Sequence, residues 1–132
     1  MAKLVENGEQ VRVIDNLSTG KKENLNKYLN EIESINGDLI DYEITRMAVK
    51  NINYVIHQAT LPSVPRSIED PIKTNLNNIN ATVNLLFACV RPNNVKRAVQ
   101  AASSSAYGNT PLLPKIENMN PIPRSPYAAS KL

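Results

Sequence analysis

Short runs of β-branched and apolar residues, separated by segments with helical spacing, constrain the fold of this chain more than any other feature. The sequence predicts strands at residues 10–15, 35–42, 53–57 and 95–102. Strands that alternate with helices pair in parallel through right-handed crossovers. We therefore expect an open α/β sheet, whose functional edge lies at the carboxyl ends of its strands.

The segments between these runs predict the helices and loops. Residues 1–7 form a helix that ends at Gly8, and residues 21–33 form a polar helix with Leu25, Leu29 and Ile32 on one face. The clearest helix spans residues 72–90 and ends before Pro92. Residues 58–71 and 111–126 are rich in proline and are expected to be loops, the first with one irregular turn. A last helix opens at Ser125-Pro126 and begins at Tyr127.

Composition limits the remaining possibilities. With 132 residues, 42% of them hydrophobic, the chain is one domain or a piece of one. Its net charge of +3 is scattered, so neither a nucleic-acid partner nor a membrane anchor is expected. The single Cys89 and single His57 exclude a disulfide framework and a Cys/His metal site. Nothing resembles a signal peptide or a membrane span, and the expected location is the cytoplasm.

Asp15 ends the first predicted strand, where a carboxylate can accept hydrogen bonds from the ribose hydroxyls of an adenosine. It would also repel a 2′-phosphate, which favours NAD over NADP. An acidic turn or cap residue is an equally good interpretation of Asp15 alone. The small polar residues that follow would let the backbone wrap the ribose: Asn16, Leu17, Ser18, Thr19 and Gly20. Asp38 and Leu39 could contact the adenine, although an Asp after Gly is more often an ordinary turn.

A second polar loop follows the third predicted strand. Its backbone could lie against the pyrophosphate and nicotinamide ribose of a cofactor at Gln58, Ala59, Thr60 and Leu61. The small side chain of Ala59 would allow a close approach, whereas His57 is interpreted as a packed residue. The next segment, from Ser63 to Ser67, combines a rigid proline turn with Arg66 and two hydroxyls, and it is equally compatible with an ordinary loop.

The strongest candidate for chemistry joins Ser103, Ser104 and Ser105 with the pair Tyr127 and Lys131. Residues four apart on a helix share a face, so the Lys131 ammonium and the Tyr127 phenol can point at one ligand. A nearby cation favours the ionised form of a phenol, which suits Tyr127 for a role as a base. Ser103 can then hydrogen-bond a substrate hydroxyl. An isolated Tyr-x-x-x-Lys pattern is weak, but a strand-terminal serine run before it strengthens the prediction.

With these motifs the chain resembles the extended short-chain dehydrogenase/reductase family, and within it the UDP-glucose and UDP-N-acetylglucosamine 4-epimerases. The matching segments are VRVIDNLSTGKKENL, VIHQATLPSVPRSIEDP, NNINATVNLL, SSSAYGNTPLLP and SPYAASKL. The resemblance implies a Rossmann-type, doubly wound parallel sheet and NAD as cofactor. It places residues 15–20 at the adenosine ribose, Asp38 and Leu39 at the adenine, and residues 58–61 and Asn77 beside the cofactor.

The same resemblance assigns the catalytic roles to Ser103, Tyr127 as base, and Lys131, which would also bind the nicotinamide ribose. It assigns UDP-sugar contacts to Ser63, Asn78, Ser104 and Ser105. The family's first strand, its GxxGxxG loop and its sugar-binding C-terminal lobe have no counterpart in the sequence. Residues 1–132 are thus expected to be a partial NAD-binding Rossmann domain that binds NAD weakly at best and is inactive alone.

The implied reaction oxidises the sugar at C4 to a transient ketone and reduces it on the opposite face. Related 4,6-dehydratases carry Asp-Glu after the catalytic hydroxyl residue, and decarboxylases carry Glu, whereas this chain has Ser104 and Ser105. Hydroxyls cannot supply that acid–base chemistry near neutral pH, which favours the epimerase. The resemblance also implies a role in polysaccharide biosynthesis, and a homodimer formed in the full-length protein by residues 72–90 and the helix at Tyr127. A non-catalytic remnant or binding module of the same fold is the alternative.

Overall fold

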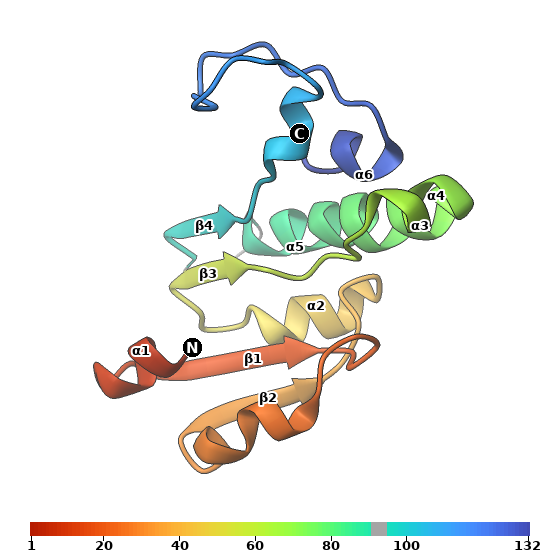
Figure 1. Cartoon of the computed structure of the whole chain (residues 1–132). Helices are drawn as coiled ribbons and strands as arrows, with labels where there is room; N and C mark the ends of the chain where they lie inside the picture. Colours follow the sequence, from red (N-terminus) through yellow and green to blue (C-terminus); the bar gives the residue numbers. More distant parts are fainter. Residues whose placement is uncertain (91–94) are drawn as a thin grey trace.

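The computed structural model describes residues 1–90 and 95–132. Its strands are β1 (Val11–Asp15), β2 (Ile32–Asn36), β3 (Tyr54–His57) and β4 (Arg97–Gln100). β1 pairs in parallel with β2, from Val11 opposite Ile32 to Asp15 opposite Asn36, and β3 pairs in parallel with β4. All strands run in the same direction (Figure 1). The predicted parallel α/β fold is confirmed, as two strand pairs, because the described residues form no ladder between β1 and β3.

The helical segments in chain order are α1 (Ala2–Glu6), the 3-10 helix η1 (Lys22–Tyr28), α2 (Tyr42–Ala48), α3 (Val64–Glu69), α4 (Pro71–Asn75), the π-helical turn η2 (Leu76–Asn80), α5 (Ala81–Val90), the 3-10 turn η3 (Ser104–Tyr107) and α6 (Pro126–Ala129). Since α4, η2 and α5 follow one another without a break, they form a single long helix (Figure 1). Residues 108–125 form a long loop that arches over η3 and returns to α6.

The core lies between the strands and the helices α2 and α5. It is built from Leu39, Val49, Ala81, Leu85 and Ala88, with Ile14 of β1 and Val55 of β3 packed against it. The two strand pairs therefore rest on the same helical layer, although they share no ladder. The rings of Tyr42 and Phe87 join α2 to α5 with centroids 5.6 Å apart. On the opposite side of the β3–β4 pair, Tyr54, Ile56 and Val99 are exposed.

The region between β1 and α2 differs from the sequence prediction. The expected helix over residues 21–33 is only the 3-10 helix η1, and Ile32 belongs to β2. Asparagines at positions 24, 26 and 30 compete with helical hydrogen bonding, which explains the shorter element. The strand predicted at 35–42 ends at Asn36, and α2 was not predicted. Its signal was present in Asp41, whose carboxylate caps the helix by accepting from the Glu43 and Ile44 amides.

Residues 58–71 were expected to be a loop, but they contain α3. Ser63 caps this helix by accepting from the Arg66 amide at 3.4 Å, and Pro65 lies in its first turn, where its missing N–H has no effect. The long helix over 72–90 is confirmed, and its π-helical turn is an addition that the sequence pattern did not indicate. Pro92, expected to stop it, lies outside the described residues. The other predicted elements, at 1–7, 10–15, 53–57, 95–102 and 127 onward, are confirmed with shifts at their ends.

Within residues 1–90 and 95–132, no helix has both the length and the apolar content needed to cross a bilayer. The same residues contain no group of three or more His, Cys, Asp or Glu side chains that could hold a metal ion.

Candidate cofactor and catalytic site

The residues predicted to bind a cofactor follow the carboxyl ends of three strands, which lie on one side of the molecule (Figure 1). The loop after β1 contains residues 16–20, the turn after β2 contains Asp38 and Leu39, and the loop after β3 contains residues 58–61. Ser103 follows β4 on the same side. The common direction of the strands thus places segments up to 88 positions apart in sequence, from residue 15 to residue 103, on the same side of the molecule (Figure 1).

The loop after β1 is held by its own side chains. Asp15 Oδ1 accepts a hydrogen bond from the Leu17 amide at 2.7 Å, and Asn16 Oδ1 accepts from the Ser18 amide at 3.0 Å. A Cβ on Gly20 would lie 3.0 Å from Asp15 Oδ2, so glycine lets the loop fold back onto this carboxylate. Within the described residues Asp15 Oδ2 accepts no hydrogen bond. A free carboxylate oxygen at a strand end fits a ribose hydroxyl, so the chemistry of this loop suits NAD.

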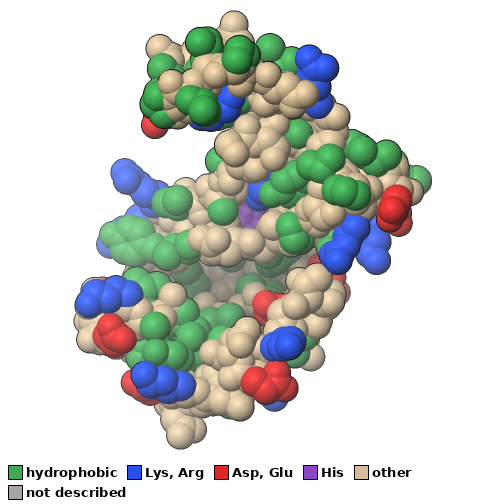
Figure 2. Space-filling model, in the orientation of Figure 1, with side chains coloured by type: hydrophobic (Ala, Val, Ile, Leu, Met, Phe, Trp, Pro, Cys, Tyr) green, Lys and Arg blue, Asp and Glu red, His purple; other side chains and the backbone are tan. Residues whose placement is uncertain are grey.

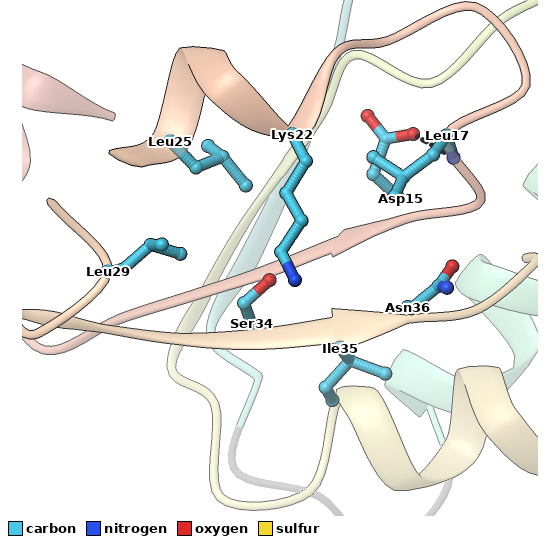
Figure 3. A pocket seen from close by; sticks show the side chains of 8 residues that line it. All are labelled: Asp15, Leu17, Lys22, Leu25, Leu29, Ser34, Ile35 and Asn36. Carbon is cyan, nitrogen blue, oxygen red and sulfur yellow. Dashed lines mark hydrogen bonds between the residues drawn. The ribbon is translucent and has the colours of Figure 1, made fainter. Parts of the chain in front are cut away.

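A cavity of about 210 Å³ adjoins this loop on the β1–β2 pair. Its lining residues are Asp15, Leu17, Lys22, Leu25, Leu29, Ser34, Ile35 and Asn36. Figure 3 shows the Lys22 side chain, from η1, extending across the cavity toward Ser34. The sequence interpretation did not include Lys22, although it directly follows the Thr-Gly-Lys stretch at the end of the ribose loop.

The turn after β2 is joined to the ribose loop, because Asp38 Oδ2 accepts from Asn16 Nδ2 at 2.7 Å. The other oxygen, Oδ1, accepts from the Ile40 amide at 2.9 Å. The Leu39 side chain is 7% exposed and belongs to the core. Only the backbone of Leu39 is therefore available to an adenine, and the Asp38 carboxylate is the adjacent side chain that could contact the same base.

The loop after β3 is clamped by Asn78 from the π-helical turn. Asn78 Oδ1 accepts from the Leu61 amide at 2.7 Å, and Asn78 Nδ2 donates to the Leu61 carbonyl at 3.2 Å and to Ser130 Oγ at 2.9 Å. Both amide hydrogens of Asn78 are thus used inside the protein, where the residue is 3% exposed. The preceding Asn77 is half-buried and donates to the Lys73 carbonyl at 2.8 Å. The π-helical turn therefore directs two adjacent asparagines to different environments.

The rest of this loop is more open. Gln58 and Ala59 are exposed, and the Thr60 hydroxyl oxygen is buried without a hydrogen bond to any described residue. Ser63 has φ 109°, a conformation that L-residues rarely adopt. Backbone strain and an unsatisfied hydroxyl three residues apart are more common at binding sites than elsewhere.

The serine run forms a 3-10 turn at the end of β4. Ser103 is extended and its Oγ accepts from the Ser105 amide at 3.2 Å. Ser104 is exposed, and Ser105 is half-buried. A cavity of about 430 Å³ next to this turn is lined by Ala102, Ser103, Ser104, Ala106, Tyr107, Glu117, Met119, Pro121, Lys131 and Leu132. It brings Ser103 and Lys131 together, whereas Tyr127, which is half-buried, is not among its lining residues.

Lys131 follows α6, which Ser125 caps by accepting from the Ala128 amide at 3.0 Å. Its side chain is 8% exposed, and this burial lowers the pKa of Lys131 from its ordinary value. Buried His57 lies 2.9 Å from Thr82 Oγ1 through Nε2. Burial, and secondarily the charge of Lys131, lowers the pKa of His57. His57 is therefore a packed residue, as the sequence interpretation placed it, and it lies within electrostatic reach of Lys131.

The sequence did not predict several residues that support the site through hydrogen bonds inside the protein. Ser130, Thr82 and Asn84 hydrogen-bond the segments that carry the predicted site. Spacing alone gave no signal for Thr82 or Asn84, because their partners are distant in sequence. Side chains of both charges lie around the hollow in the middle of the molecule in Figure 2.

Comparisons with known proteins agree on one family. The profile of the NAD dependent epimerase/dehydratase family matches residues 1–132. The UDP-glucose 4-epimerase of Mycolicibacterium smegmatis is 34% identical over 98% of this chain and 42% of its own length. The structure of UDP-N-acetylglucosamine 4-epimerase from Methanobrevibacter ruminantium, in complex with UDP-N-acetylmuramic acid, has a TM-score of 0.90 at 42% identity, over 98% of this chain and 41% of that one.

A further similar structure was solved with a cofactor. The Thermus thermophilus UDP-glucose 4-epimerase, in complex with NAD, has a TM-score of 0.84 at 38% identity, over 98% of this chain and 42% of that one. The present chain therefore spans about two fifths of the length of the relatives that it matches.

Proposed function

Because the chain belongs to the NAD-dependent epimerase/dehydratase family, we propose that it forms the NAD-binding part of a 4-epimerase that acts on UDP-glucose or UDP-N-acetylglucosamine. The observation that carries this proposal is the placement of Ser103 and Lys131 around one cavity at the carboxyl end of β4, next to three loops suited to a dinucleotide. Three of the similar proteins, at 34–42% identity, are named as UDP-glucose or UDP-N-acetylglucosamine 4-epimerases, and these names support the substrate class.

NAD would be held at several points along the carboxyl edge. Asp15 Oδ2 accepts a ribose hydroxyl, with Asn16, Leu17, Ser18, Thr19 and Gly20 around it. Asp38 and the Leu39 backbone face the adenine, and Gln58, Ala59, Thr60, Leu61 and Asn77 lie along the nicotinamide half. NAD bound there would supply the hydride acceptor and donor needed for oxidation and reduction at sugar C4.

The protein's own groups would handle the proton and the orientation of the sugar. Tyr127 accepts the proton of the C4 hydroxyl, while Ser103 hydrogen-bonds the same oxygen and orients it. The Lys131 ammonium binds the nicotinamide ribose. Its burial strengthens this interaction, because water screens it less. Ser63, Ser104 and Ser105 complete the proposed sugar contacts, whereas buried Asn78 supports the site by holding the loop at Leu61.

Dehydration and decarboxylation are less well supported. Both reactions need a carboxylate next to the catalytic hydroxyl residue, and this chain has Ser104 exposed and Ser105 half-buried at those positions. Neither hydroxyl can act as a general acid or base near neutral pH. The structure offers Glu117 in the same cavity, but it belongs to the long loop and not to the serine turn.

A second candidate function is NAD binding without turnover. The observation that favours it is the position of Tyr127, which does not line the cavity that contains Ser103 and Lys131. In this case the chain binds the dinucleotide, but its base does not reach the sugar.

The proposal also covers the oligomeric state of the protein, its cellular location and its biological role. An exposed apolar stripe runs along the long helix through Ile72, Leu76, Ile79, Val83, Leu86 and Val90. Such a stripe supports a homodimer in the full-length form. We place the protein in the cytoplasm and its product in polysaccharide biosynthesis.

One pair of assays tests the proposal. The chain, completed with the segments of a relative that it does not cover, is incubated with NAD and UDP-galactose or UDP-N-acetylgalactosamine. C4 inversion is followed by chromatography, with Tyr127→Phe as the matched control. NAD binding is measured separately by calorimetry. Inversion that Tyr127→Phe abolishes supports the epimerase, and NAD binding without inversion by the parent supports the second candidate. If no NAD binds at millimolar concentration, or if Tyr127→Phe is fully active, the assigned site is wrong.

A further inference from the structure

We propose that Asn84 is a positioning residue for the adenine end of NAD, which it controls through the turn that follows β2. This inference rests on the proposed NAD site, but it concerns a residue of α5 that lies outside that site. Asn84 Nδ2 donates to the Leu39 carbonyl at 3.1 Å and to the Ile40 carbonyl at 2.8 Å. These contacts join residues 45 and 44 positions apart.

The turn itself is a closed hydrogen-bonded unit. The Asp41 amide donates to the Asp38 carbonyl at 3.0 Å, and the Ile40 amide donates to Asp38 Oδ1 at 2.9 Å. The Leu39 carbonyl also accepts from Thr45 Oγ1 at 3.1 Å. With Asn84 added, both carbonyls of the turn's central residues are held by α2 and α5.

One backbone donor at the centre of this turn is left over. Among the described residues, the Leu39 amide N–H makes no hydrogen bond, whereas the amides of Ile40 and Asp41 do. Because the Leu39 side chain is fixed in the core, this N–H has a set direction. Beside it stands the Asp38 carboxylate, held by Asn16. Adenine presents an acceptor nitrogen and an amino donor on one edge, and the Leu39 N–H and the Asp38 carboxylate match this pair.

Asn84 can hold the turn accurately because its helix is anchored. The next residue, Leu85, and Ala81 and Ala88 are all buried in the core. The same helix fixes the loop after β3 through Asn78, six residues earlier (84 − 78), which is about 9 Å along a helix. One rigid element thus sets the position of the loops for both halves of NAD.

The test measures the affinity of the purified chain for each half of the cofactor separately. AMP represents the adenine half and nicotinamide mononucleotide the nicotinamide half, and each is titrated into the chain by calorimetry. Asn84→Leu keeps the side-chain volume and removes the donors, and Asn84→Asp replaces the donors with a charge that repels both carbonyls. Asn80→Leu is the matched control, because Asn80 lies on the same long helix and, among the described residues, its side chain bonds only the exposed Asn75. Midpoints of thermal unfolding are recorded for every variant.

We expect Asn84→Leu to weaken AMP binding about tenfold, Asn84→Asp to weaken it further, and neither to change affinity for nicotinamide mononucleotide more than about twofold. Asn80→Leu should match the parent. Unchanged AMP affinity in Asn84→Leu, or an equal loss for both probes, overturns the inference while the proposed NAD site stands. If the parent binds neither probe, the proposed site fails and this inference fails with it.

Discussion

Asn78 donates a hydrogen bond through Nδ2 to Ser130 Oγ at 2.9 Å, across 52 positions of sequence. Ser130 Oγ in turn donates to the Tyr127 carbonyl at 2.8 Å. The same Asn78 holds the amide and carbonyl of Leu61. The loop after β3 and the turn that carries Tyr127 and Lys131 therefore meet at one buried side chain.

Replacement of Asn78 should destabilise the fold. Asn78→Ala leaves the Leu61 backbone groups and the Ser130 hydroxyl without partners in a buried position, so we expect a loss of about 2–3 kcal/mol of unfolding free energy. Urea titration followed by circular dichroism measures it. Asn75→Ala, which removes only an exposed contact with Asn80, should change stability by less than about 0.5 kcal/mol. Equal losses in the two variants would contradict the role of Asn78.

The pH dependence of stability should contain a contribution from His57. Its pKa is lowered in the folded protein below the ordinary value of 6.5, so the unfolded chain binds the proton more readily. Stability should therefore fall as the pH drops below about 6.5, by at most about 1.4 kcal/mol per pH unit from this group. His57→Gln keeps a partner for Thr82 and removes the titration. Its stability should be flatter between pH 5 and 7 than that of the parent, and identical slopes would refute the prediction.

Two glycines with positive φ should respond differently to alanine. Gly8 has φ 78° with no atom within 4 Å of an added Cβ, whereas at Gly108, with φ 64°, the Cβ would lie 2.3 Å from the Ile122 carbonyl oxygen. Gly8→Ala should cost about 1 kcal/mol from conformation alone. Gly108→Ala should cost clearly more, because backbone must move as well. Thermal unfolding of both variants decides the matter, and similar costs would show that residues 108 and 122 are not in close contact.

Asp15→Asn should relax the choice between NAD and NADP. The amide oxygen can still accept from the Leu17 amide, so the loop is expected to keep its shape. Removal of the negative charge abolishes repulsion of a 2′-phosphate, and we expect the affinity ratio of NAD to NADP to fall about tenfold or more. Calorimetry with both dinucleotides measures the ratio. An unchanged ratio would place the adenosine ribose elsewhere.

The sequence predicted the features that depend on local patterns. The strand ending at Asp15, the strand ending at His57 and the proline-opened helix at Tyr127 each carry a periodicity or cap that is visible within a few residues. The resemblance in those segments was sufficient to predict the family, which the comparisons confirm.

Features that depend on distant contacts were not predictable in this way. Asn78 was expected to touch the sugar, yet its amide hydrogens are used by Leu61 and Ser130, and no spacing rule connects these residues. The helix α2 was not predicted, and only its first residue, Tyr42, fell within the strand predicted at 35–42. The placement of Lys131 near His57, 74 positions apart (131 − 57), likewise follows from the fold alone.

The absence of a ladder between β1 and β3 in the described chain has a mechanical consequence. The β1–β2 pair carries Asp15 and the turn at Asp38, and the β3–β4 pair carries Ser103, with only the helical layer joining the two. A dinucleotide that reaches from Asp15 to Ser103 would span both halves and act as a brace between them. The thermal unfolding transition of the free chain should then be broad or resolve into two phases, one for each strand pair. Saturating NAD should convert it into one cooperative transition.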